Sequence, residues 1–402
     1  MISRNKSKKV VVGLSPKQNS FHSFATGQAG GTASPRKVVV GLSGGVDSAV
    51  AAALLKQQGY EVVGIFMKFW QAPADGRAEG GWNRCCSFDA QQRARAVARV
   101  LGIRFYVLNL EQQFRREIVD YFLRESRTGR TPNPCVVCNK KVKFGLLIDK
   151  ARAIGADYVA TGHYARLWWE IRSTKHEIRN KAQIPIFKIL KAKDKNKDQS
   201  YFLWQLNQKQ LSKILFPIGE TANKEEVRGL ARKFNLPVAE TRESQEVCFI
   251  KNTPEEFLKK YLKEKPGEIQ NKTGQTLGRY NGLWFYTIGQ RKGIGLSGGP
   301  YFVIAKDFKK NILIVSKNEK DLLSKELVAK DVNWISGIEP AKFQNIQAKI
   351  RYGAKLAKIK AFQKIGKDEY KIIFFKSRRA ITPGQSVVFY LRDKLLGGGV
   401  IG

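Results

Sequence analysis

Eight residues near the start of the chain have the types and the spacing to bind a phosphate group. They are Gly41, Leu42, Ser43, Gly44, Gly45, Val46, Asp47 and Ser48. Three β-branched residues, 38–40, precede them and predict a buried strand, and the good helix formers 49–58 follow. A strand that turns on glycines into a helix aims several backbone N–H groups at one point, with the helix dipole behind them. The sequence therefore predicts an anion site, to which two serine hydroxyls can contribute.

The order of residues in this loop limits which ligands are candidates. No Lys-Ser or Lys-Thr follows at Walker spacing, and the string is not the dinucleotide fingerprint. Gly-Leu-Ser-Gly-Gly-Val-Asp-Ser resembles instead the pyrophosphate loop of enzymes that split ATP into AMP and pyrophosphate to adenylylate a carbonyl oxygen. An ordinary glycine turn is the alternative, but the whole eight-residue string favours ATP, with Mg²⁺ as its counterion.

A second motif carries two thiols. Cys135 and Cys138 lie three positions apart, behind two prolines and before a run of lysines, at a spacing found in metal and redox sites. Nearby cations favour the nucleophilic thiolate. Another cysteine, Cys248, stands far along the chain. A lone cysteine is more often a small buried apolar residue, so the sequence context has to decide its role.

The elements that must position these residues alternate between strand and helix. Strands are predicted at 62–66, 105–108 and 158–160, and helices at 90–101, 114–127 and 142–154. This rhythm predicts an α/β domain with a doubly wound parallel sheet, in which ligands bind at the carboxyl ends of strands. The eight-residue loop, Met67 and Gly162 all fall at such ends, which supports a nucleotide site there.

Composition restricts the partners. The 402 residues include 72 Lys+Arg and 34 Asp+Glu, a net charge of +38, which favours a polyanion such as nucleic acid over a neutral surface. The alternative is a general lysine bias. Five unevenly spaced cysteines indicate a reducing compartment, and no apolar run is long enough to span a membrane. We therefore expect a cytoplasmic protein with no membrane partner, and organelle import through residues 1–35 is a lesser alternative.

Four segments are predicted. Residues 1–35 lack acids and read as a disordered basic leader, and 36–250 form the ATP-binding catalytic domain. Residues 172–197 interrupt that domain as a flexible basic insertion, with nine Lys/Arg against two acids. Short β-rich runs at 283–288, 301–304, 312–315, 372–375 and 387–391 predict a small β-containing middle domain, 251–320, and a C-terminal β-barrel, 321–402. The barrel is basic, with 16 Lys/Arg against 7 Asp/Glu.

Across residues 36–402 the chain resembles the tRNA-specific 2-thiouridylases, the MnmA/TrmU family. The matching strings are 41–48, 64–68, 129–140, 160–164, 197–203, 248–250, 287–293, 351–352 and 382–385. The resemblance implies a PP-loop ATPase that adenylylates C2 of the wobble uridine in tRNAs of the Lys, Glu and Gln type. Sulfur then replaces AMP and leaves 2-thiouridine. A sulfur-donor protein, such as a cysteine desulfurase or a sulfur carrier, is the implied partner.

The resemblance also assigns residues. ATP is held by Gly41, Leu42, Ser43, Gly44, Gly45, Val46, Asp47, Ser48, Met67 and Gly162. Cys138 is the nucleophile and Cys248 the persulfide-bearing cysteine. The residues expected to contact tRNA are Asn133, Pro134 and Cys135, beside the target base, with His163, Lys197, Asp198, Gln199, Arg351, Tyr352 and Gln385.

One position departs from much of the family. Many members have Asp where this chain has Cys135. Cys135, Cys138 and Cys248 could then ligate an iron–sulfur cluster with one open iron that carries sulfide. The rival is a persulfide relay between Cys138 and Cys248, with Cys135 a bystander. The cluster is slightly favoured, and a structural zinc that also uses Cys85 and Cys86 is less favoured.

Two other functional classes remain open at this point. An amide-forming ATP pyrophosphatase would share the loop, but it needs an ammonia source and neither the basic charge nor the paired cysteines. A non-catalytic RNA-binding protein could keep the loop as a relic. His163 follows a glycine at a strand end, where a core histidine is unusual, so we predict a substrate contact.

Overall fold

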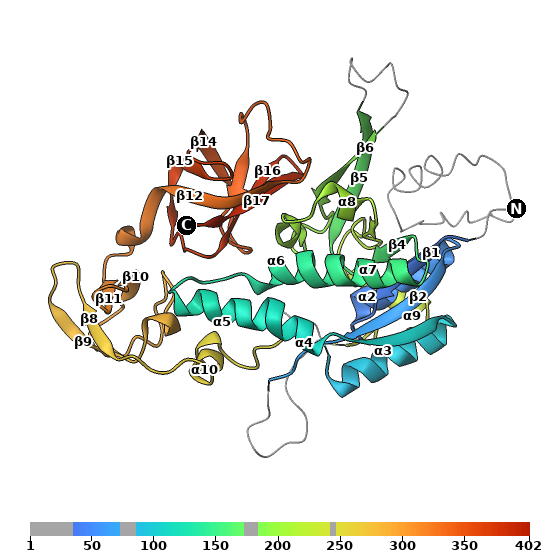
Figure 1. Cartoon of the computed structure of the whole chain (residues 1–402), viewed down its shortest axis with the longest axis horizontal. Helices are drawn as coiled ribbons and strands as arrows, with labels where there is room; N and C mark the ends of the chain where they lie inside the picture. The colour runs from blue at the N-terminus through green and yellow to red at the C-terminus, as the bar shows by residue number, and fades with distance from the viewer. Residues whose placement is uncertain (1–34, 73–85, 173–183, 242–246) are drawn as a thin grey trace, which may run out of the picture.

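The computed structural model describes residues 35–72, 86–172, 184–241 and 247–402. The predicted leader at 1–35, Cys85 and the centre of the predicted basic insertion lie outside these ranges, apart from residue 35. The α/β domain occupies one end of the molecule and the middle domain predicted at 251–320 the other, with the C-terminal barrel between them (Figure 1). No helix within the described ranges is long and apolar enough to cross a membrane.

A parallel sheet forms the centre of the first domain. Its strands, in spatial order, are β3 (Arg104–Asn109), β2 (Glu61–Lys68), β1 (Lys37–Gly41), β4 (Tyr158–Ala160) and β7 (Ile214–Leu215). Val38, Val39 and Val40 of β1 are fully buried. Val38 and Val40 face the core cluster of α2 on one side, and Val39 packs with Leu147 on the other. A strand buried on both faces requires the continuous β-branched run seen in the sequence.

Helices cover both faces of this sheet. The helices that pack on it are α2 (Val46–Gln57) and α3 (Phe88–Leu101) on one face and α7 (Leu147–Ala153) on the other. The other helices within the described ranges are α4 (Glu111–Phe114), α5 (Asp120–Arg127), α6 (Pro134–Cys138), α8 (Gln208–Leu211), α9 (Lys224–Lys233) and α10 (Pro254–Lys259). Two π-helical segments, η1 (Arg115–Val119) and η2 (Asn139–Leu146), and a 3₁₀ turn, η4 (Ser200–Leu203), join some of them. Ser87 caps α3 by accepting a hydrogen bond from the Ala90 N–H, and Gly102 ends it in the left-handed conformation. The doubly wound α/β domain is confirmed.

The middle domain is a small sheet of four strands. In spatial order they are β10 (Phe302–Asp307), β11 (Ile312–Ser316), β8 (Gly267–Gln270) and β9 (Thr276–Tyr280). Alternate side chains, such as Ile269, Val303 and Leu313, form its core. The strand predicted at 283–288 is wrong, because Leu283–Phe285 forms a 3₁₀ turn, η5, whose apolar residues are buried without strand pairing.

The C-terminal domain is a closed antiparallel barrel. It follows a short 3₁₀ turn, η6 (Glu319–Leu322), and its strands are β12 (Leu323–Trp334), β15 (Tyr370–Arg379), β14 (Ala357–Lys364), β13 (Gln347–Lys349), β16 (Ser386–Leu391) and β17 (Lys394–Ile401). β12 pairs with both β15 and β17, which closes the ring. The middle β-domain and the barrel are thus confirmed.

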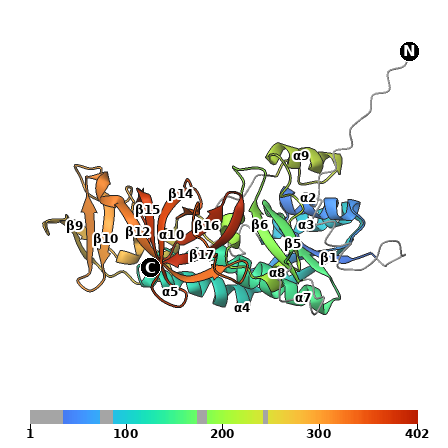
Figure 2. The ribbon, with the colours of Figure 1, turned by 90° about the horizontal axis from the view of Figure 1, so that it is seen from above.

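The barrel sheet continues into the first domain. β5 (Ala165–Arg172) and β6 (Ile184–Lys191) form an antiparallel hairpin, and β6 pairs with β17. Figure 2 shows this hairpin between the barrel and the parallel sheet. The described part of the predicted basic insertion is therefore largely a strand that extends the sheet of another domain.

Candidate active site

The glycine loop has the shape of an anion cradle. The Ser43 N–H and the Ser43 hydroxyl both lie 3.2 Å from Ser48 Oγ, and Ser48 Oγ donates to the Gly45 carbonyl at 3.1 Å. Gly44 has φ of +73°, and a Cβ there would lie 2.2 Å from the Ala90 carbonyl oxygen. Only glycine fits at this position, so the backbone can turn tightly in front of α2.

Three strand ends meet at this loop. A Cβ on Gly41, at the end of β1, would lie 3.3 Å from Met67 Cε, which comes from β2. A Cβ on Gly162, just after β4, would lie 2.6 Å from both Asp47 C and Ser48 N at the start of α2. The ATP-binding residues expected from the sequence are therefore in one place, although their contact with ATP stays a prediction. Backbone N–H groups at the N-terminus of a helix, such as those that begin α2, suit a phosphate group.

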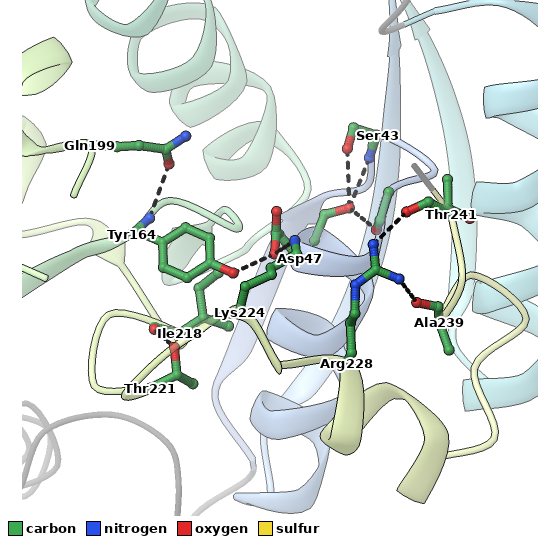
Figure 3. A network of polar contacts seen from close by, with 12 residues as sticks. Ser43, Asp47, Tyr164, Gln199, Ile218, Thr221, Lys224, Arg228, Ala239 and Thr241 are labelled. Carbon is green, nitrogen blue, oxygen red and sulfur yellow. Dashed lines mark hydrogen bonds and ion pairs between the residues drawn. The ribbon is translucent and has the colours of Figure 1, made fainter. Parts of the chain in front are cut away.

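Asp47 is the centre of a polar network behind the loop (Figure 3). Its Oδ1 accepts hydrogen bonds from the Tyr164 hydroxyl at 2.8 Å and from Lys224 Nζ at 2.6 Å. Gln199 holds Tyr164 in turn, because its side-chain oxygen accepts from the Tyr164 N–H at 3.0 Å. On the other side of the loop, Arg93 Nε donates to the Gly44 carbonyl at 3.0 Å. Residues from α2, α3, α9 and the β4–β5 segment thus fix the loop.

Cys138 is the last residue of α6 and is buried, with 8% of its surface exposed. Pro134 opens this short helix, a position where the missing N–H costs nothing. Cys138 belongs to the same core cluster as Leu42 and Val46 of the loop, and the half-buried Cys248 packs against that cluster. The two sulfur-transfer residues expected from the sequence therefore share one core with the nucleotide loop.

Phe249, the residue that follows Cys248, anchors this part of the chain in the core. Its ring is buried and makes edge contacts with Phe114, Phe122 and Phe257, with centroids 5.3–5.9 Å apart. These rings come from α4, α5 and α10. Edge-to-face aromatic packing of this kind fixes the backbone at Cys248 relative to the helices that lead to Cys138.

The three thiols of the iron–sulfur hypothesis are not gathered into one metal-binding group within the described residues, and the choice between cluster and relay stays a prediction. Across the described ranges, no group of three or more His, Cys, Asp or Glu side chains is placed to hold a metal ion. Cys135 and Cys138 lie three residues apart on the single turn of α6, a spacing that makes side chains neighbours on a helix. The Cys86 thiol donates to the Phe69 carbonyl at 3.4 Å inside the core, which leaves it unsuited to the zinc alternative.

The segment before α6 is held by all three domains. The Thr131 N–H donates to the Pro383 carbonyl at 2.8 Å, and Gln385 Nε2 donates to the Thr131 carbonyl at 2.9 Å. The hydroxyls of Thr131 and Thr287 lie 3.3 Å apart. A barrel loop and a middle-domain residue therefore fix the start of the segment that carries Asn133, Pro134 and Cys135. Gln385 was expected to contact tRNA, and in this structure its amide clamps Thr131.

Two residues expected to contact tRNA, His163 and Asp198, are buried and hydrogen bonded within the protein, and their contact with tRNA stays a prediction. His163 is buried against Phe144 and Phe216, and its Nδ1 lies 2.7 Å from the Thr161 hydroxyl. Burial, assisted by the charge of Lys143, holds the pKa of His163 well below its usual value. Asp198 is also buried, with 4% of its surface exposed.

The Asp198 carboxylate organises the turn before η4. It accepts hydrogen bonds from the N–H groups of Ala192 and Ser200 and from the Ser200 hydroxyl, at 3.0–3.2 Å. Lys197 and Gln199 on either side are half-buried. A carboxylate satisfied in this way and removed from solvent has no surface to offer an anion.

Arg351 and Tyr352 lie on the surface, as a tRNA contact requires. Tyr352 is 39% exposed, and its ring lies 4.5 Å from Phe202 and 5.9 Å from Tyr201. Tyr201 in turn donates to the Ser386 carbonyl at 2.9 Å. This aromatic group joins the barrel surface to η4, an arrangement that suits base stacking, and contact with tRNA stays a prediction.

Sequence reasoning missed Tyr164 and Lys224. Tyr164 stood within a matching string but received no role, and only its partner in space shows one. Lys224 is 177 residues from Asp47 in the sequence, so no local pattern could have identified the pair. At the start of an amphipathic helix, Lys224 looks in the sequence like an ordinary solvent-exposed lysine.

Three family models match consecutive parts of the chain. They are described as the tRNA methyl transferase HUP domain, residues 36–252, the tRNA methyl transferase PRC-barrel domain, residues 255–317, and the aminomethyltransferase beta-barrel domain, residues 324–401. The fold and the loop therefore define a HUP-domain protein with a PP-loop, followed by a PRC-barrel domain and a β-barrel.

Relatives over nearly the full chain identify the family. Proteins named tRNA-specific 2-thiouridylase MnmA from Carboxydothermus hydrogenoformans and Clostridioides difficile are each 45% identical, over 91% of this chain and 97% and 98% of theirs. A third, named tRNA-specific 2-thiouridylase MnmA 1, from Caldanaerobacter subterraneus, is 47% identical over 91% of this chain and 97% of its own. The chain belongs to the tRNA-specific 2-thiouridylase MnmA family. This membership decides against the amide-forming and non-catalytic alternatives.

Likeness to solved structures is weaker. The NMN synthetase from Francisella tularensis matches 57% of this chain and 74% of its own at 17% identity, with a TM-score of 0.30.

Proposed function

We propose that the protein is an ATP-dependent tRNA-uridine 2-sulfurtransferase that works by a persulfide relay. The observation that supports this most is the shared core of the PP-loop and Cys138, against which Cys248 also packs. Family membership supports the tRNA substrate, and so does the net charge of +38, because phosphate neutralisation dominates nucleic-acid affinity.

Activation comes first. The uridine O2 attacks the α-phosphorus of ATP, pyrophosphate leaves, and the uracil carbonyl oxygen becomes part of a leaving group. Backbone N–H groups of the loop and the N-terminus of α2 hold the phosphates, and Mg²⁺ bound with the nucleotide would offset part of their negative charge. Fixed donors aimed at the developing charge are worth more here than in water because they need no reorganisation.

Sulfur transfer follows. The terminal sulfur of a Cys248 persulfide attacks C2 and AMP leaves with the former carbonyl oxygen. The Cys138 thiolate then attacks the inner sulfur, which breaks the S–S bond, releases 2-thiouridine and forms a Cys138–Cys248 disulfide. A thiol reductant from solution must reduce this disulfide before the next turnover. The persulfide is loaded by a sulfur-donor protein.

The test is reconstitution with unmodified tRNA, ATP, Mg²⁺ and a persulfide source, read by mass spectrometry of the tRNA nucleosides. We expect 2-thiouridine from the wild-type protein and none from Cys138→Ser or Cys248→Ser. Cys86→Ala is the matched control, because it removes a buried thiol that the relay does not use. Thiolation by Cys248→Ser at the wild-type rate would refute the relay.

An iron and sulfide assay on protein purified without oxygen separates the two sulfur sources. The relay predicts full activity in protein without stoichiometric iron. Activity that rises in proportion to bound iron would instead favour the cluster.

A further inference from the structure

Lys224 reaches the nucleotide loop from a distant part of the chain. It is the first residue of α9, and its Nζ lies 2.6 Å from Asp47 Oδ1. Only 14% of the Lys224 side chain and 32% of the Asp47 side chain are exposed. The Tyr164 hydroxyl donates to the same oxygen at 2.8 Å, and the Tyr164 ring lies 5.8 Å from the ammonium group. The pair is therefore enclosed and well defined (Figure 3).

Asp47 places a negative charge where the fold collects an anion. It is the second residue of α2, directly after the glycines that expose their backbone N–H groups. An uncompensated carboxylate at this point attracts the same donors and repels the triphosphate. Screening by salt is weak for a pair that is mostly buried.

The attachment of α9 does not depend on Lys224. Val227 and Ala231 are fully buried in the core cluster of α2, and Asn223 caps the helix by accepting from the Glu226 N–H. Arg228 also donates to the carbonyls of Ala239 and Thr241, at 2.6 and 3.2 Å. These contacts attach α9 without Lys224, whose ammonium group contacts Asp47 of the loop.

We propose that Lys224 is a residue of the nucleotide site that neutralises Asp47, so that the PP-loop accepts the triphosphate of ATP. The inference rests on the proposed function, because it takes ATP as the ligand. It makes α9 a part of the site, although no motif of the chain includes it.

The experiment is calorimetric titration of the full chain with the non-hydrolysable α,β-methylene analogue of ATP and Mg²⁺. We expect Lys224→Gln to weaken analogue binding by about tenfold, as loss of a charge-assisted interaction predicts. Lys224→Arg keeps the charge and retains most of the affinity. The double variant Asp47→Asn with Lys224→Gln removes both charges and recovers most of the loss.

Lys272→Gln is the matched control, because Lys272 pairs with Asp321 at 2.8 Å in the middle domain. It should bind the analogue like the wild-type protein. Wild-type affinity in Lys224→Gln would overturn the inference while the proposed function stands. A double variant no tighter than Lys224→Gln would overturn neutralisation as the mechanism. A wild-type protein that binds no analogue would overturn the proposed function itself.

Discussion

Gly162→Ala should impair ATP binding through a single methyl group. The new Cβ would lie 2.6 Å from Asp47 C and Ser48 N, and Cβ contacts under 3.0 Å are essentially never observed. Both contacts are backbone, so the segment after β4 and the N-terminus of α2 must separate by several tenths of an ångström. Such overpacking costs about 1–3 kcal/mol. Because ATP binding has to reverse the displacement, we expect affinity to fall roughly 5- to 150-fold.

The assay is the same titration with the ATP analogue, with urea unfolding of each variant measured alongside. Gly229→Ala is the control, because a Cβ there meets nothing within 4 Å and sits inside α9. This control should bind the analogue normally and be slightly more stable, since alanine is the better helix former. If Gly162→Ala binds the analogue with wild-type affinity, the close contact between the two segments does not shape the site.

Gln385→Ala should lower the free energy of unfolding by about 1 kcal/mol, because it removes the hydrogen bond to the Thr131 carbonyl. Urea titration measures this change, and an unchanged free energy of unfolding would show that this hydrogen bond does not stabilise the segment before α6. The His163 pKa is held well below 6.5, so the unfolded chain binds the extra proton and stability falls as pH drops through 6.5. His163→Asn should flatten that slope, and an identical pH profile would contradict the burial argument. Burial lowers the pKa of Lys306 to about 8, so stability should rise between about pH 8 and 10.5, and Lys306→Met should remove this rise in thermal melts taken across that range.

The sequence was sufficient for β1 to β4 of the parallel sheet and for the position of the loop, but it did not indicate the two-residue strand β7. Apolar runs such as 38–40 and 158–160 are buried on both faces, so their pattern is decided locally and the strands form where predicted. The meeting of Met67 and Gly162 at the loop followed from the rule that parallel strands end at one edge.

Other features depend on contacts between distant residues. The 283–288 run has strand composition but forms a turn, because its apolar residues bury without a pairing partner. His163 looked like a surface ligand because the sequence does not show that Phe144 and Phe216 pack against it. The Lys224–Asp47 pair and the β6–β17 pairing likewise join residues that no local pattern relates.

The sheet shared between β6 and β17 sets an order for biosynthesis. Lys191 and Arg392, which are hydrogen bonded at this junction, are 201 positions apart. At a translation rate of ~5–20 residues per second, the ribosome completes the partner strand roughly 10–40 s after it has made the hairpin. During that interval the outer edge of the hairpin lacks its final neighbour, and an unpaired edge recruits foreign strands. A nascent chain of this protein therefore has a period of aggregation risk between the synthesis of the hairpin and that of β17, and a stop codon shortly before β17 would make that exposure permanent.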